Sequence, residues 1–141
     1  MGAPEKSKTD IGYELPSLCK VVTLDKMRKF SAWHGKTIHV DEELALQVGL
    51  PGPIAEGLMS YAYLMEVMLS FFGESWLRGG VLSVNFLGYV LPGDTITARA
   101  VVMSRETEES RDRIGLQVWC ENQRGEKVVA GTANGFLPKS A

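Results

Sequence analysis

The sequence has few of the residues from which metal and disulfide sites are built. Its 141 residues include two cysteines and two histidines. Cys19 and Cys120 lie far apart and form no CxxC or Cys/His ligand set, so a zinc site is not indicated. We therefore expect two reduced, buried thiols, and neither a metal nor another cofactor.

An excess of one charge is also lacking. The chain carries 15 Lys and Arg against 17 Asp and Glu, with a formal net charge of -2. No broad basic field is available to hold a polyanion, so a nucleic-acid partner is not expected. The hydrophobic content of 45% is ordinary for a folded protein. A chain of this length predicts one domain with one core.

Long uncharged apolar runs are absent as well. Residues 53–72 form the most apolar stretch, but Glu56, Ser60, Glu66 and Ser70 interrupt it. A membrane-spanning helix needs about 20 predominantly apolar residues, so a buried helix is the better interpretation. The polar residues 1–14 lack the apolar segment of a signal peptide and predict a flexible arm before a domain over 15–141. We expect no membrane partner and a cytoplasmic location.

Two hydrophobic periods follow one another along the chain. Apolar residues recur with helical spacing from Leu58 to Phe72, and Gly73 is a plausible C-cap. From residue 80 the period becomes two, which is typical of half-buried strands. Turns are predicted at 91–94 and 122–125, and the charged run 104–113 predicts a solvated hairpin tip. The alternating apolar positions are Leu82, Val84, Phe86, Val90, Ile96, Ala98, Ala100, Val102, Ile114, Leu116, Val118 and Cys120.

This order of elements predicts an α+β fold. A short strand and small helices precede one long apolar helix, and about four antiparallel strands follow it. A sheet wrapped around the single helix buries both sets of apolar residues, and that arrangement is a hot-dog fold. Such a domain leaves an edge strand and part of the helix layer uncovered, so we expect a homodimer or a higher homo-oligomer.

The most informative stretch for function is Thr37–Ser60, TIHVDEELALQVGLPGPIAEGLMS. It places His39 ahead of a short helical segment and Gly57 at the start of the long helix. A helix start offers free backbone N–H groups and a partial positive charge to an oxyanion. Histidine is the side chain best able to move a proton near neutral pH. The pattern therefore favours chemistry on an activated carbonyl compound.

Four pieces of the sequence carry a family resemblance. TIHVDEELA, GPIAEGLMS, VNFLGYVLPGDTITA and AGTANGFLP occur in this order between about Thr23 and Pro138. Together they resemble the MaoC-like acyl dehydratases and R-specific enoyl-CoA hydratases. The resemblance implies a hydro-lyase that adds water to 2-enoyl thioesters, or removes it from 3-hydroxyacyl thioesters, on CoA or an acyl carrier.

The same resemblance assigns site residues. The family histidine corresponds to His39, the oxyanion-binding glycine to Gly57, and the family aspartate to His34. A His34/His39 pair would divide the work, one ring serving as base and the other as acid. Glu56 stands where relatives often have histidine, and it either replaces the missing carboxylate or stabilises the helix start.

Alternative interpretations remain for some of these residues and for the function. Asp41 either orients His39 or caps the following helix, and Gly57 either binds an oxyanion or permits close packing. Two other functions fit the pattern: a hot-dog thioesterase using Glu56 or Glu66, and a non-catalytic acyl-CoA-binding subunit of a heteromeric dehydratase. Candidates for lining an acyl tunnel, which core packing would also explain, are Met59, Tyr63, Met65 and Trp76.

Overall fold

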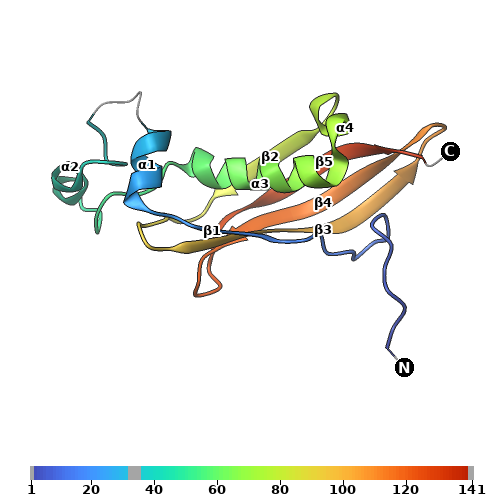
Figure 1. The fold of residues 1–141 in the computed structure, drawn as a ribbon, viewed down its shortest axis with the longest axis horizontal. Coiled ribbons are helices and arrows are strands. Elements are labelled where there is room, and N and C mark those ends of the chain that lie inside the picture. The colour runs from blue at the N-terminus through green and yellow to red at the C-terminus, as the bar shows by residue number, and fades with distance from the viewer. Residues whose placement is uncertain (1, 32–35, 140–141) are drawn as a thin grey trace.

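The structure, a computed structural model, describes residues 2–31 and 36–139. The described residues form five strands and four helices, and the longest helix packs against an elongated sheet (Figure 1). In chain order they are β1 (Leu18–Val21), α1 (Leu24–Phe30), α2 (Glu42–Gln47), α3 (Gly57–Phe72), α4 (Glu74–Leu77), β2 (Val81–Phe86), β3 (Thr95–Thr107), β4 (Arg111–Glu121) and β5 (Lys127–Pro138).

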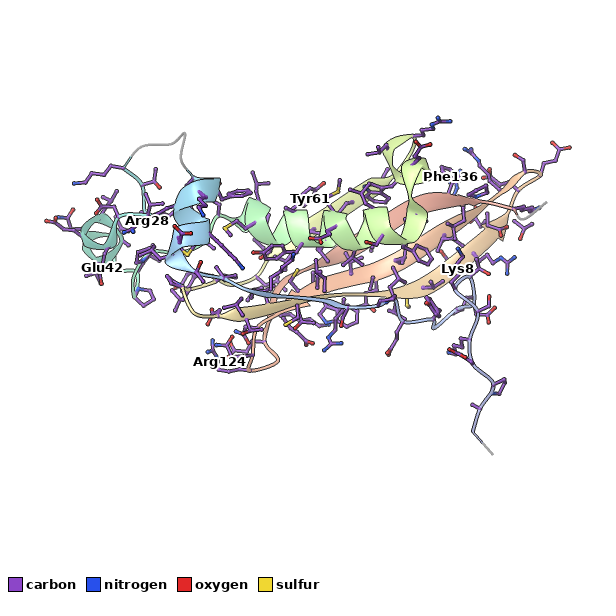
Figure 2. All side chains as sticks on the ribbon, viewed as in Figure 1. Lys8, Arg28, Glu42, Tyr61, Arg124 and Phe136 are labelled. Carbon is purple, nitrogen blue, oxygen red and sulfur yellow. The ribbon has the colours of Figure 1, made fainter. Side chains whose placement is uncertain are left out.

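The five strands form one antiparallel sheet in the order β1-β3-β4-β5-β2. The predicted hairpin turn between β4 and β5 is confirmed: Gly125 has a φ of 75°, and its N–H donates to the Asn122 carbonyl over 3.0 Å. Figure 2 shows Arg124 at the tip of this turn. The charged run 104–113 is confirmed as a hairpin end, closed by a 2.8 Å bond from Glu108 N–H to the Arg111 carbonyl.

Helix α3 lies along one face of the sheet (Figure 1). Leu64 and Met68 are fully buried on its inner side, where they meet the inward row of the strands. Burying side chains of this size stabilises the fold by about 1.5–3 kcal/mol each. The predicted hot-dog fold, an α+β sheet packed around one long helix, is confirmed. The fully buried strand residues include Ile96, Ala98, Val102, Ile114, Val118, Cys120 and Ala133.

Among the described residues, part of the outer side of α3 is exposed. Leu58 is 58% exposed and Leu69 is 40% exposed, although the helix is apolar on most faces. On the sheet, no described residue pairs with the outer edge of β2. Strand β2, whose outer edge is unpaired, contacts α3 (Figure 1).

Strand β2 is shorter than the alternating pattern over 80–90 predicts. It ends at Phe86, because the N–H groups of Leu87 and Gly88 both donate to one acceptor, the Val128 carbonyl, over 2.8 and 3.3 Å. The chain then leaves the sheet, and the Val90 carbonyl accepts from Ala55 N–H over 2.8 Å. This departure brings residues 86–90 to the start of α3.

The N-terminal segment pairs with β3 before β1 begins. Gly12 N–H donates to the Val102 carbonyl over 2.7 Å, and Leu15 N–H donates to the Ala100 carbonyl over 3.0 Å. Backbone groups of β3 that would otherwise lie unpaired at the sheet edge gain hydrogen-bond partners in this way. The domain boundary at residue 15 stays a prediction.

The expectation of two buried thiols is wrong for Cys19. This residue is exposed, since β1 is a short edge strand on which it faces outward. Cys120 is buried beneath α3, and its Sγ lies 3.6 Å from the Ser60 carbonyl oxygen. Burial raises the pKa of the Cys120 thiol to about 12. Helices long and apolar enough to cross a membrane are not found in residues 2–31 and 36–139.

Candidate active site

His39 is held in a tight turn between α1 and α2. The Thr37 carbonyl accepts from Val40 N–H and Asp41 N–H over 3.2 and 2.9 Å, and the Thr37 hydroxyl oxygen accepts from His39 N–H over 3.2 Å. The imidazole Nδ1 lies 2.8 Å from the Ile54 carbonyl oxygen. Because a carbonyl only accepts, Nδ1 must carry the hydrogen. In the neutral ring, Nε2 is therefore left with its lone pair free to accept a proton.

The segment before α3 is fixed on both sides. Ile54 N–H donates to the Ile38 carbonyl over 3.2 Å, so the two segments exchange hydrogen bonds around His39. Ala55 N–H donates to the Val90 carbonyl. These bonds set the position of the His39 ring relative to the first turn of α3.

Gly57 is the first residue of α3, as the sequence predicts for the helix start. Its N-cap residue, Glu56, has an extended backbone and makes no side-chain cap bond to the helix. The Glu56 carbonyl accepts from Met59 N–H over 2.9 Å. Within the described residues, the Gly57 N–H has no acceptor. Such unpaired N–H groups at the positive end of a 16-residue helix favour a negatively charged oxygen.

His39 and Gly57 border the same cavity. It has a volume of about 510 Å³ and brings together the His39 turn, the start of α3 and the segment that follows β2. Most of its lining side chains are apolar, so the cavity suits an acyl group beside an imidazole and an amide. The lining residues are His39, Ile54, Ala55, Gly57, Leu58, Phe86, Leu87, Gly88 and Tyr89.

Glu56 occupies a different position from His39. Its Oε1 accepts a 2.9 Å hydrogen bond from the hydroxyl of Ser31, which is 2% exposed at the C-cap of α1. Glu56 does not line the cavity described above. Its carboxylate therefore contacts the C-terminal end of α1, and it is not among the residues that line the cavity.

Asp41 is an N-cap, and that interpretation is confirmed. Its Oδ1 accepts from Leu44 N–H over 2.8 Å at the start of α2, and Lys36 Nζ lies 3.5 Å from Oδ2. The Leu44 backbone hydrogen bond lowers the pKa of Asp41 below its usual range. The atom that orients the His39 ring is instead the Ile54 carbonyl oxygen.

The remaining candidates lie elsewhere. His34 falls outside the described residues. Glu66 faces the β1 side, where its Oε2 is 3.5 Å from Lys20 Nζ. The four suggested tunnel residues do not line this cavity: Met59 and Trp76 are buried in the core, and Tyr63 and Met65 are half-buried against it. Burial raises the pKa of Tyr63.

The segment Phe86–Tyr89, which forms a wall of the site, was not predicted from the sequence. The available signal was the piece VNFLGY, in which Leu87 and Gly88 break the alternation of β2. The Ile54 carbonyl was not predicted either, because a main-chain acceptor has no signature in the residue types. Among the described residues, no group of three His, Cys, Asp or Glu side chains is placed to hold a metal ion.

The chain is similar to known proteins in family and in fold. The family model of the MaoC like domain matches residues 20–118. None of the curated protein sequences matches the chain significantly.

Solved structures show the same fold at low sequence identity. A monoamine oxidase regulatory protein from Archaeoglobus is 27% identical, with a TM-score of 0.75 over 94% of this chain and 92% of that one. The (R)-hydratase from A. caviae involved in PHA biosynthesis is 21% identical, with a TM-score of 0.75 over 94% of this chain and 100% of that one. The ChsH1-ChsH2 complex from Mycobacterium tuberculosis includes a chain 18% identical, with a TM-score of 0.71 over 94% and 99%.

Proposed function

The chain belongs to the MaoC-like domain family, and we propose that it is a hydro-lyase acting on acyl thioesters. The substrate class is a 2-enoyl thioester of CoA or of an acyl carrier, and the product is the 3-hydroxyacyl thioester. The reverse dehydration uses the same groups. The observation that carries this proposal is the shared cavity of His39 and Gly57.

The proposed reaction uses the His39 imidazole and the Gly57 N–H. The thioester oxygen accepts a hydrogen bond from Gly57 N–H at the positive end of α3, which stabilises the negative charge that develops there. His39 Nε2 removes a proton from water, and the water oxygen forms a bond to the β carbon. The π electrons move toward the thioester oxygen, and a proton is then delivered to the α carbon. Water is consumed and no redox partner is needed.

A second proton-transfer group completes this scheme. His34 is the proposed group, in the position of the family aspartate, with one imidazole acting as base while the other acts as acid. Glu56 is the alternative, because it lies one residue before Gly57; its carboxylate accepts from the Ser31 hydroxyl outside the cavity lining, so this role requires the side chain to rotate toward the cavity. The two assignments differ in which substitution, His34→Ala or Glu56→Gln, removes turnover.

The assembly we propose is a homodimer that pairs along β2. The cavity opens among apolar side chains at this end of the sheet: Leu58, Phe86, Leu87 and Tyr89 are each more than half exposed. A second copy across the β2 edge would cover these side chains and supply partners for the free backbone groups. The pocket would then be shielded from water on its open side.

Hydration of 2-enoyl-CoA esters of several chain lengths tests the proposed activity. We expect loss of the conjugated absorbance and formation of the 3-hydroxyacyl ester. A thioesterase would instead release free CoA thiol. No described contact favours that activity, because Glu66 is paired with Lys20 and Glu56 lies off the cavity. Lack of hydration at every chain length would contradict the proposal.

A non-catalytic subunit of a heteromeric dehydratase is the second candidate. What favours it is that the family resemblance places His34 at the position of the family aspartate. A chain with this role would bind acyl-CoA without turning it over and would gain activity only beside a second hot-dog chain. Turnover by the purified chain alone excludes it.

A further inference from the structure

Phe86 lies directly against the backbone of Gly57. A Cβ atom placed on Gly57 would come within 2.6 Å of Phe86 Cε1 and 2.8 Å of Phe86 Cδ1. All three heavy atoms nearest to that position belong to this ring. Separations this short do not occur between real side chains, so the ring fills the space beside the Gly57 Cα.

The ring is held there by the end of β2. Phe86 pairs with Val129 of β5, and the next two N–H groups donate to the Val128 carbonyl, so its backbone position is set by the sheet. The side chain is 54% exposed, and it lines the cavity together with His39 and Gly57. One part of Phe86 therefore touches the glycine while another part faces the proposed substrate space.

This contact restricts the part of the substrate nearest to Gly57. A thioester oxygen bound to the Gly57 N–H brings the carbonyl carbon and its α carbon beside the same residue. The β carbon must lie toward His39, which supplies the base. A substituent on the α carbon therefore has to share space with the Phe86 ring or with the fixed backbone of residues 54–56.

We infer that Phe86 is a specificity-determining residue that selects acyl thioesters with no branch at the α carbon. This inference rests on the proposed function, since it assumes that the thioester oxygen binds at Gly57. One extra methyl group in an apolar pocket changes kcat/KM by about 10- to 200-fold. The wild-type protein should discriminate within that range.

The test compares two isomeric substrates, 2-butenoyl-CoA and 2-methylpropenoyl-CoA, which differ in the position of one carbon. The ratio of their kcat/KM values is measured for the wild type, Phe86→Ala, Phe86→Leu and the control Leu77→Ala. Leu77 is 73% exposed on α4 and does not line the cavity. We expect Phe86→Ala to shift the ratio at least about 10-fold toward the branched substrate, Phe86→Leu to shift it less, and Leu77→Ala to leave it unchanged.

Equilibrium binding of butyryl-CoA and isobutyryl-CoA separates this inference from the proposed reaction. If the wild type turns over neither enoyl ester but Phe86→Ala still improves binding of the branched ligand over the straight one, the specificity role holds and the hydratase proposal fails. An unchanged ratio in Phe86→Ala, in turnover and in binding, overturns the specificity role alone. Absence of both turnover and binding in the wild type overturns both.

Discussion

The imidazole Nδ1 of His39 donates a hydrogen bond to the Ile54 carbonyl oxygen, 2.8 Å away and 15 residues later in the chain. This bond fixes the tautomer of the ring and turns the basic nitrogen away from the backbone. The adjoining Ile54 N–H is itself bound to the Ile38 carbonyl. The His39 turn and the start of α3 are therefore positioned as one unit.

We predict that His39→Asn removes activity and leaves the fold intact. The asparagine amide nitrogen occupies the place of Nδ1 and can still donate to Ile54, but nothing replaces Nε2. Loss of the base should lower kcat by about 10²- to 10⁴-fold. His39→Ala should lose the same activity and, in addition, about 1 kcal/mol of stability with the Ile54 hydrogen bond. Steady-state kinetics and urea unfolding measure both effects, and a near-normal rate in His39→Asn would refute the assignment.

We predict that Gly57→Ala is harmful because of Phe86 and not because of its amide. Alanine keeps the N–H group, but its Cβ overlaps the ring, and such overpacking costs about 1–3 kcal/mol. The double variant Gly57→Ala/Phe86→Ala should recover both stability and part of the activity lost by the single variant. A double-mutant cycle on the free energy of unfolding measures this coupling. Additive effects would show that the contact is unimportant.

The two cysteines should react very differently. Cys19 is exposed, whereas Cys120 is buried with its pKa raised to about 12. A thiol reagent at pH 8 should therefore modify one thiol in the native protein and two in denaturant. Mass spectrometry of the native adduct should locate the label on Cys19. A rapid native reaction of Cys120 would contradict its position beneath α3.

Burial of the Cys120 thiol should make the folded protein less stable at alkaline pH. The folded pKa of Cys120 lies above the ordinary value of 9.0, so the unfolded chain releases its thiol proton first as the pH rises. The contribution of the Cys120 thiol to the free energy of unfolding is fully present below about pH 9 and decreases as the pH rises toward 12. The loss should be about 1 kcal/mol at pH 10. Because lysines and tyrosines also titrate there, the comparison is with Cys120→Ala, whose decrease between pH 8 and pH 10 should be smaller.

Asp112 should be replaceable by an apolar residue. It is 6% exposed on β4; its Oδ2 lies 3.2 Å from Arg105 Nη2, and its buried Oδ1 has no hydrogen-bond partner among the described residues. An unpaired buried oxygen costs about 1–3 kcal/mol. Asp112→Leu has a similar shape and leaves Arg105, whose side chain is 40% exposed, in contact with water. We expect Asp112→Leu to raise the melting temperature and Arg105→Ala to lower it; a lower value for Asp112→Leu would refute this reading.

The proposed dimer predicts sensitivity at the β2 edge. Val81 is 60% exposed on this strand, and a lysine there opposes pairing with another strand. Val81→Lys should shift the mass measured by light scattering toward that of one chain. Met103→Lys is the matched control, since Met103 is 54% exposed on β3 within the sheet. An unchanged dimer in Val81→Lys would place the interface elsewhere.

The sequence predicted the elements more accurately than their ends. Helical spacing located α3, and alternation located the strands, because each period repeats over neighbouring residues. The end of β2 at Phe86 was missed, since it depends on two N–H groups sharing the Val128 carbonyl of another strand. Cys19 was placed inward, although a short edge strand buries only one face.

The candidate site was likewise predicted only in part from the sequence. His39 and Gly57 were predicted from residue type and position, and the structure brings both to one cavity. The capping role of Asp41 was open in the sequence and is decided by its bond to Leu44 N–H. Phe86 was read only as a strand residue, and its contact with Gly57 depends on how β2 crosses the start of α3.

The sequence by itself determined the order of helix and strands, the single core and the family, because these depend on local periodicity and on short motifs. Only the tertiary structure decided which carbonyl orients His39, which ring covers Gly57, and which faces of α3 and β2 remain open. Those relationships join residues far apart in the chain. They arise from the packing of whole elements, and no residue type or spacing along the chain specifies them in advance.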